Sequence, residues 1–159
     1  MDPMIRGYRE SDFRSVVALE RENSPGDCKP EVFIRQAGVL FADTFLVAER
    51  DGRVVGYTIG ALVQHRPATG WIVRLVVAEG YRRRGLGGDL VAAVTGSLRE
   101  RGAGEIYLSV APGNRVARAL YERHGFRETD FCPGYFGEGG DRHILRSDLA
   151  GREDLICPD

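Results

Sequence analysis

Arginines and glycines gather between residues 82 and 88, in the order Arg82-Arg83-Arg84-Gly85-Leu86-Gly87-Gly88. An apolar run over residues 71–77 precedes them, and a helical pattern that extends to Arg101 follows. The first turn of a helix leaves backbone N–H groups unpaired and carries partial positive charge, and glycine lets a phosphate approach the backbone closely. The stretch therefore predicts a phosphate-binding loop. It fits neither common nucleotide fingerprint, because Leu90 stands where the dinucleotide pattern needs glycine and no glycine-lysine-serine/threonine sequence is present.

A second candidate pair is Asn114 and Tyr121, which are seven residues apart. Seven residues make nearly two helical turns, so both would lie on about the same side of a helix. Taken singly, Asn114 is a good N-cap and Tyr121 a good packing residue. Their common side makes a functional pair possible.

Alternation and turn signals predict the elements that position these residues. Strands are expected at 5–9, 44–50, 53–63, 68–77, 105–110, 126–131 and 142–148, with Asp51-Gly52 as a hairpin turn. Helices are expected from an N-cap at Ser11 to just before Asn23, from Pro30 to Leu40, from Leu86 to Arg101, and from the segment 112–114 to His124. The predicted order is β-α-α-β-β-β-α-β-α-β-β, with one domain over residues 1–149 and a polar tail over 150–159.

This order, the spacing Arg82-x-x-Gly85-x-Gly87 and the run Asn114-Arg115-Val116-Ala117-Arg118-Ala119-Leu120-Tyr121-Glu122-Arg123-His124-Gly125-Phe126 resemble the GNAT superfamily of N-acetyltransferases. In its motifs the chain is most similar to the ribosomal-protein-alanine N-acetyltransferase branch. The resemblance covers nearly the whole chain and implies an α/β (α+β) fold: a mixed, mostly antiparallel central sheet flanked by helices.

The resemblance also implies acetyl-CoA as co-substrate and assigns the residues that contact it. The pyrophosphate would bind the loop, the pantetheine arm would pair with the edge of a splayed strand, and the asparagine of the second motif would face the arm. These residues are Leu75, Val76, Val77, Arg82, Arg83, Arg84, Gly85, Leu86, Gly87, Gly88 and Asn114. The hydroxyl of Tyr121 would be the catalytic acid, because a tyrosine with a pKa near ~10 can protonate a departing thiolate whose conjugate acid has a pKa near ~8.5.

One position departs from the branch. Where the branch has a glutamate as general base, this chain has Ser109, whose hydroxyl cannot act as a base near neutral pH. Glu22, His65 and His143 are conceivable replacements, and nothing in their spacing selects one, so the base stays unassigned.

The glycine-rich segment 134–140 holds Tyr135 and Phe136, similar to an aromatic pair that flanks the peptide entrance in N-terminal acetyltransferases. We therefore expect transfer of an acetyl group to a primary amine, foremost a protein or peptide N-terminus. A small-molecule amine is the alternative acceptor. A non-catalytic acyl-CoA-binding module is a further alternative, favoured by Ser109 and opposed by Tyr121.

Composition narrows the range of partners. A net charge of −1 over 159 residues and arginines without interleaved aromatics argue against nucleic-acid binding. The chain has no apolar run of membrane-spanning length and no histidine or cysteine spacing typical of a metal site. Three widely spaced cysteines suggest free thiols, a reducing compartment and hence the cytoplasm. The expected oligomeric state is a monomer or a homodimer.

Overall fold

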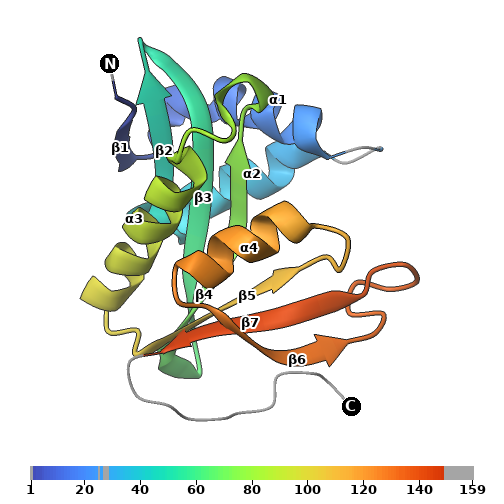
Figure 1. Ribbon diagram of the computed structural model, residues 1–159. Coiled ribbons are helices and arrows are strands. Elements are labelled where there is room, and N and C mark those ends of the chain that lie inside the picture. Colours follow the sequence, from blue (N-terminus) through green and yellow to red (C-terminus); the bar gives the residue numbers. More distant parts are fainter. Residues whose placement is uncertain (1, 25, 27–28, 149–159) are drawn as a thin grey trace.

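The computed structural model describes residues 2–24, 26 and 29–148 (Figure 1). The predicted polar tail, 150–159, lies outside the described residues. A mixed seven-stranded sheet has the order β1-β2-β3-β4-β5-β7-β6, in which β4 and β5 pair in parallel and all other neighbours are antiparallel. Its strands are β1 (Met4–Gly7), β2 (Phe45–Arg50), β3 (Arg53–Val63), β4 (Arg66–Val77), β5 (Glu105–Val110), β6 (Arg127–Cys132) and β7 (Arg142–Asp148).

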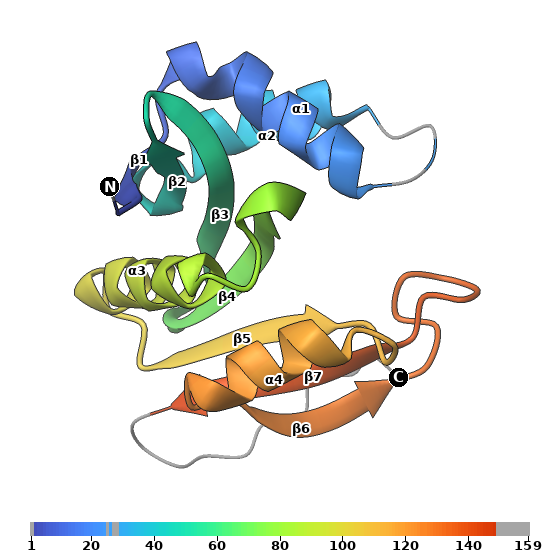
Figure 2. The same ribbon diagram turned by 45° about the horizontal axis from the view of Figure 1, so that its top comes forward.

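The helices cover both faces of this sheet. They are α1 (Phe13–Asn23), α2 (Pro30–Leu40), α3 (Leu86–Glu100) and α4 (Arg115–Arg123). Figure 2 shows α1 and α2 on one side of the sheet and α3 on the other. Buried side chains of α1 and α2 pack on alternate residues of β2 and β3, whereas α3 packs on the residues between them. A further apolar cluster joins α3 and α4 to β5 and β7.

The hairpin between β2 and β3 turns at the predicted dipeptide. Asp51 has φ +50° and Gly52 has φ +75°. Two successive positive φ angles belong to a type I′ turn, whose twist matches that of the flanking strands. The prediction for this turn is therefore confirmed.

The prediction of a Ser11 N-cap is wrong. Ser11 lies inside a short 3-10 turn, Glu10–Asp12, and α1 begins after this turn. Asp12 fills the local role instead: its carboxylate accepts the backbone N–H of Arg9 at 2.8 Å and binds Arg6 with both oxygens. A hydrogen bond accepted by a carboxylate that a guanidinium holds in place is stronger than one accepted by a neutral hydroxyl.

The prediction of three free thiols is also wrong. Cys132, buried at the end of β6, is disulfide-bonded. The spacing of the cysteines in the sequence does not show which of them the fold brings together. Because the prediction of a reducing compartment rested on free thiols, the cysteines no longer support it.

In the described part of the chain, none of the helices is long and apolar enough to cross a membrane. Within the same residues, no cluster of histidine, cysteine, aspartate and glutamate side chains could hold a metal ion.

Candidate active site

The parallel strands β4 and β5 separate in the middle of the sheet. Residues 69–71 of β4 pair with residues 105–107 of β5, and the two strands then diverge, as Figures 1 and 2 show. A bulge lies where they part, because Ile59 of β3 pairs with Arg74 while Gly60 pairs with Ile72, which leaves Val73 as an extra residue. Bulges bend and twist a strand locally. Beyond residue 71 the two strands are separated by a gap, and no strand of the described chain pairs with the edge of β4 on that side.

The backbone of β4 offers hydrogen-bonding groups to this gap at alternate residues. The N–H of Ala78 donates to the carbonyl of Val55 in β3 at 2.9 Å. Successive residues of a strand direct their backbone groups to opposite edges, so Val76 also faces β3, and Leu75 and Val77 face the gap. On that side the Val77 carbonyl already accepts a hydrogen bond from Nε of Arg82 at 3.1 Å. Of the three residues predicted to pair with pantetheine, Leu75 and Val77 have the required direction.

The arginine-glycine loop ends at the start of α3 with exposed backbone donors. Gly85 is the N-cap, with φ +82° in the left-handed region, and no side chain among the described residues caps the first N–H groups of the helix. A Cβ built on Gly85 would meet nothing within 4 Å, so the space above it is open. Arg83 shares the left-handed conformation, with φ +61°. A diphosphate fits such a concave row of N–H groups at a helix N-terminus.

Gly87 and Gly88 have a packing role that the sequence did not predict. A Cβ on Gly87 would lie 3.0 Å from Leu120, and one on Gly88 would lie 2.8 Å from the ring of His124. Both contacts come from α4 or its C-terminal end. These glycines therefore allow α4 to pack closely on the first turn of α3. The buried side chain of Leu86, in the core between α3 and the sheet, anchors the same turn.

The three loop arginines are not equivalent. Besides its bond to Val77, Arg82 donates to the side-chain oxygen of Asn23, and so ties the end of α1 to the loop. The guanidinium of Arg84 lies 6.0 Å from the ring centroid of Tyr81. Arg83 and Arg84 are exposed and lie beside the open first turn of α3. Arg82 thus braces the loop, and the other two place positive charge at its surface.

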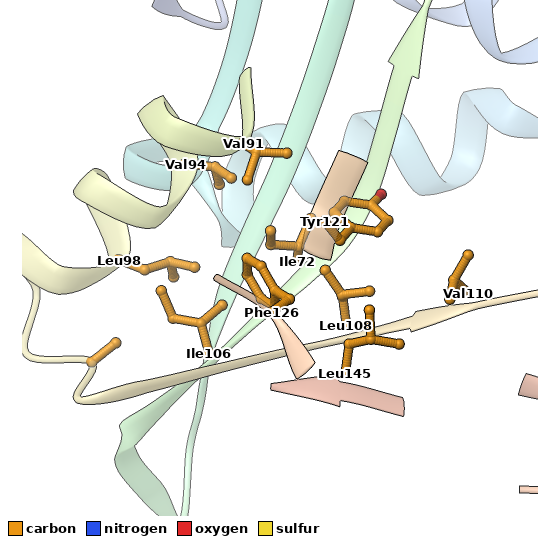
Figure 3. Packing of buried hydrophobic residues seen from close by; sticks show 11 residues of the cluster. Ile72, Val91, Val94, Leu98, Ile106, Leu108, Val110, Tyr121, Phe126 and Leu145 are labelled. Carbon is orange, nitrogen blue, oxygen red and sulfur yellow. The ribbon is translucent and has the colours of Figure 1, made fainter. Parts of the chain in front are cut away.

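Tyr121 projects from α4 into the apolar cluster beside the gap (Figure 3). The residue is 8% exposed, and its ring meets that of Phe126 edge to face, with centroids 6.0 Å apart. Figure 3 shows the hydroxyl at the end of the ring remote from Phe126. Burial raises the pKa of Tyr121, and the charges of Arg74 and Arg142 partly oppose this. The hydroxyl therefore keeps its proton at neutral pH and can serve as a proton donor.

Asn114 caps the helix that carries Tyr121. Its side-chain oxygen accepts the backbone N–H of Ala117 at 3.1 Å. Asn114 is thus the N-cap that the sequence indicates. This cap fixes the start of α4 and leaves the amide nitrogen of Asn114 as a donor for a ligand.

Ser109 is held by an arginine that sequence reasoning missed. Nε of Arg142 donates to Oγ of Ser109 at 3.1 Å, and Nη2 donates to the Ser109 carbonyl at 3.0 Å. A hydroxyl that accepts from a guanidinium cannot also act as a base. No spacing signal could have found Arg142, since all but one of the 22 basic residues are arginines.

A second missed arginine, Arg74, lies on β4 between Ile72 and Leu75, the first of the residues that face the gap. Nε of Arg74 donates to both oxygens of Glu20 at 3.1 and 3.0 Å, and Nη2 donates to Oε1 at 2.8 Å. The Tyr57 hydroxyl also donates to Glu20. Burial alone raises the pKa of Glu20, but hydrogen bonds from Arg74, Ser24 and Tyr57 outweigh it and leave the pKa below its ordinary value. Glu20 is therefore an ionised counter-ion and not a base.

The structure separates the three candidate bases. His65 is exposed in the turn between β3 and β4, at the opposite end of β4 from Val77. His143 contacts Glu128 through Nδ1, and its ring lies 5.0 Å from that of Phe131. Glu22 is exposed on α1. None of the three contacts Tyr121 or Ser109 in the described structure.

Tyr135 and Phe136 lie together in the loop between β6 and β7. Their ring centroids are 5.0 Å apart. Tyr135 packs on a buried cluster that includes Tyr107, whereas Phe136 is 67% exposed and lies 5.1 Å from the guanidinium of Arg142. The aromatic pair is therefore next to the arginine that holds Ser109.

Known proteins share this architecture. An N-alpha-acetyltransferase of Sulfurisphaera tokodaii is 30% identical over 155 residues, and the match covers 91% of this chain and 92% of that protein. An N-alpha-acetyltransferase of Saccharolobus solfataricus is 29% identical over 158 residues, and the match covers 93% of this chain and 94% of that protein. The crystal structure of Ard1 from Thermoplasma volcanium superposes with a TM-score of 0.84 at 22% identity, covering 95% of this chain and all of that one. The ribosomal-protein-S18-alanine N-acetyltransferase of Escherichia coli gives 0.78 at 22% identity, covering 97% and 99%.

The family model described as the acetyltransferase (GNAT) family matches residues 11–126, which include the arginine-glycine loop and the helix of Tyr121. A solved structure from Salmonella typhimurium, a putative acetyltransferase with its cofactor acetyl-CoA, has the same fold, with a TM-score of 0.78 at 17% identity and covering 100% of this chain and 99% of that one. The match, the splayed strands and the uncapped first turn of α3 agree: the chain belongs to the GNAT family and is an N-acetyltransferase that uses acetyl-CoA.

Proposed function

We propose that this enzyme acetylates the N-terminal α-amine of a protein or peptide. The observation that carries the proposal is its similarity to proteins named N-alpha-acetyltransferase over nine-tenths of both chains. The aromatic pair Tyr135-Phe136 beside the site supports it, because such a pair can hold an extended peptide in place.

Acetyl-CoA would lie across the gap between β4 and β5. Its pyrophosphate would accept hydrogen bonds from the first N–H groups of α3, with Arg83 and Arg84 adding charge. Its pantetheine amides would pair with Leu75 and Val77 as an added strand. A backbone N–H at this edge can polarise the acetyl carbonyl, on whose oxygen negative charge grows as the amine attacks.

The transfer needs one proton donor and one proton acceptor. The amine nitrogen forms a bond to the acetyl carbon, the carbon–sulfur bond breaks, and the thiolate takes the proton of Tyr121. The amine loses its proton to water, and the tyrosine regains one from solvent. Because Ser109 is bound by Arg142, the site holds no strong base at that position, and the amine must arrive neutral.

This requirement favours an α-amine over a lysine side chain. The α-amine has a pKa near ~8 and the lysine amine near ~10.4, so at neutral pH the α-amine is unprotonated far more often. The positive charges of Arg74 and Arg142 near Tyr121 further disfavour an ammonium ion in the site.

The proposal is tested by comparing peptides at matched concentration. One has a free small N-terminal residue, the other the same sequence with a blocked N-terminus and a lysine. We expect the free peptide to release CoA faster at pH 7, with the product identified by mass spectrometry. Acetylation confined to lysine side chains, or to polyamines and aminoglycosides without peptide turnover, would contradict the proposal and leave the acetyltransferase assignment in place.

A further inference from the structure

Arg142 places a half-buried positive charge beside the reacting groups. Ser109 receives two of its hydrogen bonds, from Nε and from Nη2, and the ring of Phe136 lies 5.1 Å away. A guanidinium has five N–H donors, so further donors remain on Nη1 and Nη2. Burial lowers the pKa of Arg142, and the charge of Arg74 adds to this effect. Arg142 thus directs a positive charge at the neighbourhood of Tyr121.

Two other partly buried arginines are compensated by carboxylates, and Arg142 is not. Arg6 pairs with Asp12 at 2.8 Å and with Glu49 at 2.6 Å, and Arg74 pairs with Glu20 at 2.8 Å. Across residues 2–24, 26 and 29–148, no carboxylate forms an ion pair with Arg142; its partners are Ser109 and the Phe136 ring. Asp141, its neighbour in the chain, accepts the backbone N–H of Gly134 at 2.7 Å instead. A half-buried guanidinium that keeps free N–H donors and has no counter-ion can bind the carboxylate of a ligand.

We propose that Arg142 binds a carboxylate of the acceptor, and that preferred peptides carry an aspartate or glutamate side chain next to the N-terminal amine. The planar guanidinium fork matches a carboxylate in two-point geometry, and Ser109 fixes its orientation. Phe136 and Tyr135, in the loop between β6 and β7, lie beside the Arg142 guanidinium. This inference rests on the proposed function, since it takes the acceptor to be a peptide.

The experiment uses three acceptor peptides that differ only at the second residue, which is aspartate, asparagine or lysine. For the unmodified enzyme, we expect kcat/KM to be roughly 10- to 100-fold higher for the aspartate peptide than for the asparagine peptide, which is the range for a charge-assisted hydrogen bond. The lysine peptide should be the poorest. Equal rates for the aspartate and asparagine peptides would overturn the inference without any variant.

Arg142→Gln then tests which residue reads the charge. The variant should lose the preference for aspartate, so that its kcat/KM values for the aspartate and asparagine peptides differ by no more than about threefold, since neither peptide then makes a charged contact with this residue. Arg142→Lys, which keeps the charge and loses the fork, should retain part of the preference. The matched control is Arg127→Gln: Arg127 is exposed at the other end of β6 and should leave the preference unchanged. A preference that survives Arg142→Gln would overturn the inference.

Free aspartate is tested as a fourth acceptor, because the carboxylate that Arg142 binds could belong to a peptide or to a free amino acid. If neutral peptides are acetylated and aspartate gives no advantage, the role of Arg142 fails and the proposed function stands. If no peptide is acetylated and the free amino acid is, in an Arg142-dependent reaction, the proposed function fails and the peptide part of this inference fails with it.

Discussion

Tyr121 combines two properties that a proton donor at a thioester needs. Its ring is fixed by the edge contact with Phe126, and its burial keeps the hydroxyl protonated well above neutral pH. The nearby Ser109 and Arg142 supply neither a base nor an alternative acid. In the proposed mechanism, catalysis therefore depends on one hydroxyl and on the orientation of the substrates.

Tyr121→Phe tests this role. The variant removes a hydroxyl and keeps the ring, so acetyl-CoA affinity measured by calorimetry should be unchanged while kcat falls by ~10²-fold or more. Tyr107→Phe is the matched control, because Tyr107 is an equally buried tyrosine on β5 whose hydroxyl bonds Glu105 at 3.3 Å. A Tyr121→Phe enzyme with full kcat would make Tyr121 a packing residue.

Gly85→Val tests the phosphate loop. The backbone at Gly85 has φ +82°, which a β-branched residue adopts only with strain, and the new side chain would occupy the open space where we propose that a phosphate oxygen binds. We expect acetyl-CoA affinity to fall at least ~10-fold while the protein stays folded, because no described residue lies within 4 Å of a Cβ at that position. Gly80→Ala, in equally open space but without positive φ, should bind normally.

At the scale of elements, sequence patterns located the strands and helices but not the contacts between distant ones. The strand Glu105–Val110 has the predicted bounds because its apolar residues alternate cleanly. The bond between Arg142 and Ser109 could not be predicted, because the two residues are 33 positions apart and meet only through the order β5-β7-β6. For the same reason His65 remained a candidate base, although its strand end lies far from the open edge of β4.

The contact between α3 and the sheet gives a stability prediction. A Cβ on Gly60 of β3 would lie 2.8 Å from Cγ2 of Val94, a stiff, fully buried side chain of α3. Gly60→Ala should therefore lower the free energy of unfolding by about 1–3 kcal/mol, measured by urea denaturation.

Gly96→Ala in α3 is the matched control for Gly60→Ala. Its Cβ would meet nothing within 4 Å, and alanine favours the helix, so the free energy of unfolding should rise by about 0.5–1 kcal/mol. Two variants that shift stability by the same amount and in the same direction would contradict the packing described.

At the scale of the whole molecule, the structure has two parts. The first consists of β1–β4 with α1, α2 and α3, and the second of β5–β7 with α4. The two parts meet along the short parallel pairing of β4 with β5 and diverge around the gap. Both parts contribute to the candidate site, with Arg74 on β4 and Tyr121 on α4, two elements that Figure 1 labels. The ion pairs of Glu20 with Arg74 and of Asp12 with Arg6 hold the first part together. Stability should therefore depend on the ionisation of these two carboxylates.

The expected pH dependence follows from the direction of these shifts. The hydrogen bond from Arg6 holds the pKa of Asp12 below its ordinary 3.8, and the network described above holds the pKa of Glu20 below its ordinary 4.5. Since both folded-state values are depressed, their stabilisation is fully present above pH 4.5 and is lost as the pH falls through the folded-state values. Melting temperatures measured across this range should decline toward acid. Glu20→Gln should show a shallower decline, and an unchanged slope would remove Glu20 as a cause.

The proposed function is transfer of the acetyl group from acetyl-CoA to an N-terminal α-amine, in the gap between β4 and β5. The most direct measurement offers one peptide with both a free small N-terminal residue and an internal lysine to the enzyme with acetyl-CoA at pH 7. Tandem mass spectrometry then locates the added acetyl group. We expect the α-amine to be acetylated before the lysine, and we expect Tyr121→Phe to abolish this acetylation. Acetyl groups found first on the lysine, or undiminished product with the variant, would contradict this expectation.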